Sequence, residues 1–202
     1  MSAAGALLVG GSTERASRLA SGLSGERLWL RPAHARGEVE GLISLPFQPA
    51  EGLRLDGLPL PLDLVAVLSD QTAAGVRPRT LGARLELMRE VLLEAFLPVR
   101  EVLRRQRDWL RLAWIISPTP LNGCGSPERA AAEAAVLGLM RGVTREFATR
   151  ASTVALVVDG AHDPEAVDRD LAATLQVLRD PGSSFYTGQV LNLTSGTWIA
   201  GA

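Results

Sequence analysis

Few side chains in this sequence can carry acid–base or nucleophilic chemistry. All 21 residues counted as lysine or arginine are arginines, so no lysine can form a Schiff base, relay a proton or hold a phosphate. The single cysteine, Cys124, excludes an internal disulfide and a thiolate metal cluster. The only tyrosine is Tyr186, and the two histidines are His34 and His162. Any reaction centre therefore has to use serine, carboxylate or histidine groups.

Those groups form no recognisable hydrolase or metal constellation. Ser117 follows an apolar run, but no Gly-x-Ser-x-Gly elbow surrounds it. Asp159, His162 and Asp163 cluster in a short polar stretch, which we interpret as a loop whose last residue caps a helix beginning at Pro164. His34 has only Glu38 nearby and is typical of an exposed loop. We predict no metal site.

Charge and hydropathy narrow the class of protein. The formal net charge is −1 without a long run of one sign, which does not favour a nucleic-acid partner. No window is long and apolar enough for a membrane span, and the first residues lack the pattern of a signal peptide, so we expect a cytoplasmic protein. One basic cluster is interpreted as a solvated helix end that complements the helix dipole: Arg100, Arg104, Arg105, Arg107 and Arg111.

Apolar strands alternate with amphipathic helices along the whole chain. We predict strands at residues 6–11, 27–31, 40–47, 62–68, 110–117, 152–158 and 189–193, and helices at 15–23, 80–108, 127–149 and 164–178. This order predicts one α/β domain over residues 1–202, a Rossmann-like doubly wound parallel sheet of about seven strands with helices on both faces. A glycine turn after the first strand is where such a sheet meets a nucleotide phosphate.

Two segments resemble the short-chain dehydrogenase/reductase family. The run from Glu133 to Arg141, followed by the strand Ala155 to Val158, is similar to the helix and strand after that family's active site. The run from Phe185 to Asn192 is similar to its closing strand, with a hydrophobic-Thr-Gly-Gln-hydrophobic pattern. The order of elements agrees over nearly the whole chain. The resemblance implies a nicotinamide-dependent oxidoreductase fold.

The functional positions depart from the family's pattern. Its Tyr-x-x-x-Lys motif, in which tyrosine is the acid/base and lysine holds the nicotinamide ribose, aligns with Arg129 and Glu133. The family's serine is represented by Ser117. A guanidinium cannot replace a phenol in proton transfer, and a carboxylate cannot replace the lysine cation. Only about five residues separate the sixth strand from the next helix, where active members carry a longer substrate cover.

The cofactor turn departs as well. The family's Thr-Gly-x-x-x-Gly-x-Gly turn appears as Gly10, Gly11, Ser12 and following residues, with Arg15 and Ser17 at the two later glycines. Glu14 adds negative charge where phosphates would bind. The family's Asn-Asn-Ala-Gly and Pro-Gly segments appear as residues 68–71 and 159–160. We expect no cofactor, and NAD or NADP only if the chain is an enzyme with atypical residues.

Two predicted helices carry surfaces suited to assembly. The helix at 80–108 has an apolar stripe, and the helix at 127–149 is rich in alanine and glycine, which permit close helix approach. Similar proteins build a four-helix dimer interface from these helices. The residues expected at an interface, together with the closing strand, are Leu85, Leu92, Phe96, Ala131, Ala135, Gly138, Gly188 and Val190.

Three functions are compatible with the sequence. We favour a catalytically deficient, non-catalytic or regulatory subunit that pairs with itself or with an active homologue. One alternative is an NAD(P)-dependent oxidoreductase with atypical catalytic residues, using Ser117 and the region of His162. Another is a small-molecule sensor or carrier that uses the vestigial cleft.

Overall fold

The structure, a computed structural model, describes residues 5–32, 38–47, 61–69, 80–118, 126–159 and 163–193. Its strands are β1 (Gly5–Gly10), β2 (Arg27–Pro32), β3 (Ile43–Phe47), β4 (Leu62–Leu68), β5 (Leu110–Ile116), β6 (Ala151–Val158) and β7 (Gln189–Leu193). Its helices are α1 (Thr13–Gly22), α2 (Leu81–Arg105), α4 (Pro127–Phe147) and α5 (Pro164–Leu178), with a 3₁₀ helix η3 (Pro181–Tyr186).

The seven strands form one parallel sheet in the order β3-β2-β1-β4-β5-β6-β7. The predicted Rossmann-like fold is confirmed. The order reverses between β1 and β4, and ligands in open α/β sheets bind at such a switch point, beyond the carboxyl ends of the strands. The turn after β1 and the residues following β4 and β5 therefore define the edge to inspect.

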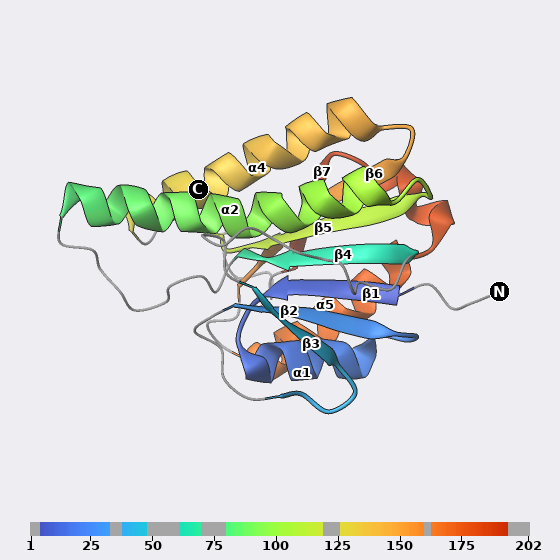
Figure 1. Cartoon of the computed structure of the whole chain (residues 1–202). Helices are drawn as coiled ribbons and strands as arrows, with labels where there is room; N and C mark the ends of the chain where they lie inside the picture. The colour runs from blue at the N-terminus through green and yellow to red at the C-terminus, as the bar shows by residue number, and fades with distance from the viewer. Residues whose placement is uncertain are drawn as a thin grey trace.

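Helices cover both faces of the sheet, and two separate cores lie beneath them. Figure 1 shows α2 and α4 together on one face and α1 and α5 on the other. All residues of β1, β5 and β6 are buried, because a parallel strand between two helical layers is shielded on both sides. Val99, Trp114 and Met140 belong to the core under α2 and α4. Trp29 and Leu171 belong to the core on the other face.

Local sequence signals correctly predicted the N-cap residues of three helices. Ser12, Ser126 and Asp163 are the predicted N-caps, and each side chain accepts a hydrogen bond from the backbone three residues on. The helix α2 continues through the buried Pro98, as predicted, but ends at Arg105 instead of Asp108. The helix ends there because the side chain of its C-cap, Gln106, is bonded to the backbone N–H and carbonyl of Leu62 at the start of β4.

Two other elements differ from the prediction by more than two residues. β3 begins at Ile43, not at residue 40, because Gly41 takes a positive φ of 76° that interrupts an extended chain. The 3₁₀ helix η3 was not predicted at all. It starts at an Asp180 cap that accepts from the Gly182 backbone, a short polar signal that precedes a proline.

The interpretation of Arg111 as part of a solvated cluster was wrong. Arg111 lies on β5 and is 0% exposed, whereas the neighbouring Arg104 side chain is 70% exposed. Its guanidinium donates to the Leu178 carbonyl (2.9 Å), to the Ser183 hydroxyl (2.7 Å) and to the Ser152 hydroxyl. Burial lowers the pKa of Arg111 to about 10.

Candidate functional site

Three residues that the sequence placed at the catalytic positions meet at the carboxyl end of β5. The carboxylate of Glu133 accepts a hydrogen bond from the Ser117 hydroxyl at 2.5 Å and from the Arg129 Nε at 2.9 Å. Glu133 is only 1% exposed, while the Arg129 side chain is 28% exposed. The cluster Ser117–Glu133–Arg129 therefore has a buried anion at its centre and a cation at its rim.

The local sequence explains this arrangement. Ser117 directly follows β5, so its side chain stands at the edge where the strands end. Arg129 and Glu133 are one helical turn apart on α4 and form an i,i+4 ion pair. The Ser126 hydroxyl accepts from the Arg129 backbone at 3.2 Å and fixes the start of that helix. Buried Ala132 and Val136 hold the same region of α4 against the core.

The contacts within this cluster are a hydrogen bond and an ion pair. An arginine side chain stays protonated in proteins, so Arg129 cannot deliver a proton to a carbonyl group. Each oxygen of Glu133 already accepts a hydrogen bond, which balances its buried charge. Tyr186 stands at the opposite edge of the sheet, just before β7, and stacks on Phe185 with ring centroids 4.0 Å apart. It does not reach the cluster.

The turn after β1 keeps a glycine geometry but is tightly packed. Gly10 and Gly11 have φ values of 77° and 78°, which side chains rarely adopt. The Trp29 indole donates to the Gly10 carbonyl at 2.9 Å. A Cβ on Gly11 would lie 2.6 Å from a methyl carbon of Leu68, the residue at the family's first asparagine position. The buried Leu68 side chain thus packs directly against the turn.

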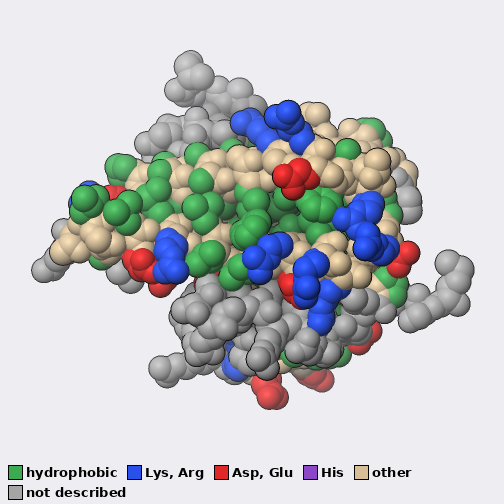
Figure 2. Space-filling view, turned by 45° about the horizontal axis from the view of Figure 1, so that its top comes forward, with side chains coloured by type: hydrophobic (Ala, Val, Ile, Leu, Met, Phe, Trp, Pro, Cys, Tyr) green, Lys and Arg blue, Asp and Glu red, His purple; other side chains and the backbone are tan. Residues whose placement is uncertain are grey.

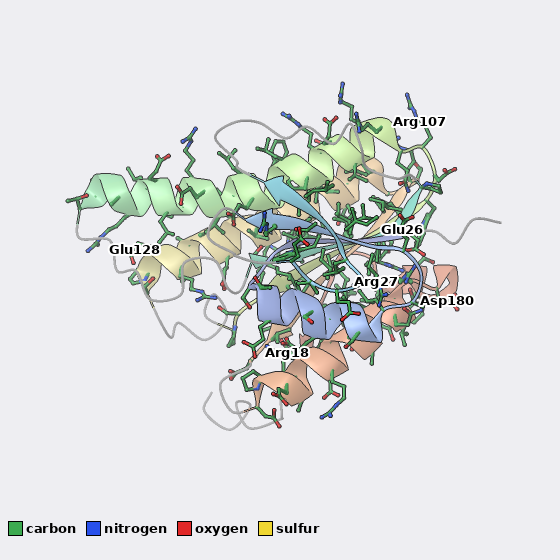
Figure 3. The ribbon with its side chains drawn as sticks, turned by 60° about the horizontal axis from the view of Figure 1, so that its bottom comes forward. Arg18, Glu26, Arg27, Arg107, Glu128 and Asp180 are labelled. Carbon is green, nitrogen blue, oxygen red and sulfur yellow. The ribbon has the colours of Figure 1, made fainter. Side chains whose placement is uncertain are left out.

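Arg15 does not occupy the phosphate turn, which changes the interpretation of this residue. Its side chain is 2% exposed, and its Nε lies 2.8 Å from a carboxylate oxygen of Asp168 on α5. Arg18 contacts the other oxygen of Asp168 at 2.7 Å and also bonds Glu14 at 2.6 Å. Figure 3 shows Arg18 on α1 close to α5. The cluster Arg15–Asp168–Arg18 therefore fastens α1 to α5, and Arg18 is the residue that offsets Glu14.

An acidic hollow of about 530 Å³ lies beside the first turn of α1. Its lining contains four carboxylates and one guanidinium, which Arg18 contributes. The lining residues are Thr13, Glu14, Ser17, Arg18, Glu38, Val39, Glu40 and Glu165. A phosphate group in this hollow would meet net negative charge, which opposes the attraction of the helix N-terminus.

The other candidates divide between described and undescribed parts of the chain. Asp163 is the cap of α5, and its carboxylate accepts from the Ala166 backbone at 3.0 Å, as predicted. Cys124, His34 and His162 lie outside the described residues. Within the described ranges, no group of three histidine, cysteine or acidic residues could hold a metal ion. No helix in that part of the chain is long and apolar enough to cross a membrane.

The predicted assembly residues lie on one helical face and on the edge strand. The apolar stripe of α2 is divided, since Val99 and Leu103 are buried in the chain's own core while Leu81, Leu85 and Phe96 are 72%, 56% and 37% exposed. Leu92 is half-buried. Figure 2 shows hydrophobic side chains gathered over α2 and α4, with arginines around them. Ala131 and Gly138 are exposed and Ala135 is half-buried on α4, whereas Gly188 and the half-buried Val190 lie at β7.

Sequence analysis did not identify two residues that are important for the structure. Arg111 and Asp168 both form buried polar clusters with residues far away in the chain. Nothing local distinguishes Arg111 from the arginines before it, except that it falls inside an apolar strand. Asp168 lies at a helix position that would face a neighbouring helix, which is the one available signal.

Comparisons with known proteins support the fold. No family profile matches the sequence, and no curated protein matches it significantly. Solved structures do match, each covering nearly the whole of both chains. A mutant actinorhodin polyketide ketoreductase with NADPH has a TM-score of 0.72 at 17% identity, covering 97% of this chain and 98% of its own. A short-chain dehydrogenase/reductase (glucose/ribitol dehydrogenase) from Brucella melitensis has 0.70 at 14% identity, covering 95% of each chain.

A third match, BdcA in complex with NADPH, has a TM-score of 0.67 at 14% identity and covers 95% of this chain and 93% of its own. The chain therefore has the fold of the short-chain dehydrogenase/reductases over almost its full length. Two of these similar structures contain NADPH. At such identities the likeness establishes the architecture, and the function has to be argued from the residues at the site.

Proposed function

We propose that this chain is a non-catalytic subunit with a short-chain dehydrogenase/reductase fold, which pairs with itself or with an active homologue. The observation that carries this proposal is the buried carboxylate of Glu133, which holds both Ser117 and Arg129. The resemblance aligns Ser117 with the family's serine, Glu133 with its lysine and Arg129 with its tyrosine, and in the family these residues move protons. Here the same positions carry a closed ion pair and a hydrogen bond, which serve structure and binding.

The cofactor edge supports the same conclusion. Leu68 packs on the turn at Gly11, and the adjacent hollow carries an excess of carboxylates. A dinucleotide would bring two phosphates to this edge without a lysine to meet them. We infer that dinucleotides bind weakly or not at all.

The surface of α2 and α4 supports the pairing. Gly82, Gly138 and Gly142 lie in these helices with open space where a Cβ would stand, as judged from the described atoms. A glycine inside a helix costs about 1 kcal/mol relative to alanine, and no contact within the described chain compensates it. Together with exposed Leu81, Leu85 and Phe96, these glycines suit close contact with another helix pair.

Chromatography with light scattering tests the pairing on wild type, on Ala135→Arg and on a matched control, Ala173→Arg. Ala173 is exposed on α5, on the opposite face of the sheet. We expect an assembly that Ala135→Arg breaks and Ala173→Arg leaves intact, alone or with a co-expressed homologue. A wild type that stays monomeric in both conditions contradicts the subunit proposal.

A second function deserves a direct test because the glycine turn keeps its geometry and similar structures contain NADPH. This function is an NAD(P)-dependent oxidoreductase with atypical catalytic residues. We expect no oxidation or reduction of alcohols or ketones by the purified protein. Turnover that disappears in Ser117→Ala would decide in favour of the enzyme.

A further inference from the structure

In the part of the chain that the structure describes, no acceptor contacts the outer edge of the Arg129 guanidinium. Its Nε donates to Glu133 at 2.9 Å, and its backbone nitrogen donates to Ser126 at 3.2 Å. Among the described residues, neither Nη atom has a hydrogen-bond acceptor. With 28% of the side chain exposed, the four N–H groups of this edge remain available to a molecule from solution.

The guanidinium is also held in place. Glu133 is 1% exposed and its second oxygen accepts from Ser117 at 2.5 Å, so the carboxylate has little freedom to move. A side chain fixed by a buried partner loses less entropy when a ligand binds, which increases affinity. Not every surface arginine has such a support. Arg89, for example, pairs with Glu86 through two exposed side chains.

The formal charges around this edge balance. Arg84 pairs with Glu128 at 3.0 Å, and Arg129 pairs with Glu133, so the four formal charges at the start of α4 balance. What remains is the partial positive charge of the helix N-terminus, where Arg129 lies in the first turn. The unused donors of Arg129 therefore face an environment that favours an anion.

We propose that Arg129 binds the carboxylate of a small organic acid at the carboxyl end of β5. Two parallel N–H groups on the outer edge match the two oxygens of a carboxylate in a bidentate pair. A phosphate dianion needs more positive charge than one guanidinium, and the charged groups next to Arg129 on α4 are the carboxylates Glu128 and Glu133. This site goes beyond the proposed subunit role and does not depend on pairing, so its test is independent of assembly.

NMR titration of the Arg Nε–Hε signals tests the proposal, with butyrate, the neutral isostere butyramide and inorganic phosphate as probes at constant ionic strength. The Arg129 signal is assigned by its loss in Arg129→Gln. We expect butyrate to shift it saturably in the millimolar range, as suits a fragment of six heavy atoms. Butyramide should leave it unchanged, and Arg89→Gln should bind butyrate like wild type.

Arg129→Lys keeps the charge but removes the bidentate edge, and we expect about tenfold weaker binding of butyrate, followed in both proteins by the backbone amide signals of the first turn of α4. This variant and the wild-type signals decide the matter even if Arg129→Gln does not fold. The absence of a saturable shift with butyrate, an equal shift with butyramide, or unchanged binding in Arg129→Lys would each overturn the proposal. Tighter binding of phosphate than of butyrate would reject the carboxylate assignment.

Discussion

At the scale of single residues, Glu133 occupies a demanding position, because its side chain is only 1% exposed. A buried carboxylate is tolerated only when its charge is balanced and its oxygens are hydrogen-bonded, and Arg129 and Ser117 meet both needs. The three residues Ser117, Arg129 and Glu133 thus form a charge-balanced polar cluster beside an apolar core. Substitutions are therefore needed to measure how much this cluster contributes to the free energy of unfolding, apart from any role in function.

Replacing one partner of this cluster should cost stability. Arg129→Met leaves Glu133 buried without its cation, and we expect a loss of about 3 kcal/mol in the free energy of unfolding. The double variant Arg129→Met/Glu133→Leu should recover much of that loss, because neither charge then remains. Urea unfolding measures both. A double variant as unstable as the single one would show that the cluster does not act as an ion pair.

Glu94 on α2 gives a pH dependence that can be measured. Burial and the neighbouring Glu90 raise the pKa of this carboxyl from 4.5 to about 7. An unfolded chain releases the proton near pH 4.5 and the folded chain near pH 7, so stability falls as pH rises between these values. Glu94→Gln should remove this decline and be roughly 2 kcal/mol more stable than wild type at pH 8.

Equilibrium unfolding between pH 4 and pH 8 provides the comparison. Glu86→Gln is the matched control, with the same change of charge at an exposed position of the same helix. Equal pH profiles for wild type and Glu94→Gln would contradict the assignment.

At the scale of elements, η3 is attached to the sheet by polar groups. Arg111 on β5 donates to Leu178 at the end of α5 and to Ser183 in η3. Ser152 on β6 bonds Thr187, and the Gly188 backbone donates to Thr153 at 2.7 Å. The Thr-Gly-Gln segment that resembles the family's closing strand therefore has a structural function here, since it seats β7 against β6.

Arg111→Met and Arg111→Ala should differ strongly. The Ser183 hydroxyl also bonds the Leu178 carbonyl, at 2.9 Å, so the loss of the guanidinium does not leave that oxygen unpaired. We expect Arg111→Met to change stability by less than about 1 kcal/mol, since it fills the space and removes a buried charge. Arg111→Ala should cost about 3 kcal/mol through the cavity. Equal losses in thermal unfolding would refute this explanation.

Gly138→Ala separates helix propensity from contact between chains. At high dilution the variant should be up to about 1 kcal/mol more stable than wild type, because the added Cβ meets open space. At concentrations where the protein assembles, the extra methyl group should weaken association. Sedimentation and unfolding over a range of concentrations give both quantities. Stronger association of the variant would argue against close helix approach at Gly138.

The sequence predicted the elements better than the contacts between them. Alternation of apolar strands and amphipathic helices is local, as are the capping signals at Ser12, Ser126 and Asp163, so these could be identified from neighbouring residues. The grouping of Ser117, Arg129 and Glu133 was predicted only through the family resemblance. Asp168 and Arg111 escaped prediction, because their partners lie more than 40 residues away along the chain.

At the scale of the whole molecule, charge limits what the cofactor edge can bind. The acidic hollow beside α1 opposes phosphates. We expect calorimetry to give no binding of NADH or NADPH at micromolar concentrations. Raising ionic strength should not weaken any residual binding, since screening reduces repulsion here. A micromolar dissociation constant for either dinucleotide would contradict the expectation that this edge of the sheet repels phosphates.

The fastening of α1 to α5 also constrains how the molecule is made. Arg18 and Asp168 are separated by 150 positions in the sequence, yet their hydrogen bond holds two helices of the same layer together. During synthesis, α1 emerges early and waits until nearly the entire chain has left the ribosome before Asp168 can reach it. Until then the core beneath α1 lacks Leu171, Leu175 and Leu178 of α5. Chaperones that hold short apolar segments would thus meet this protein at its first helix, long before its last one exists.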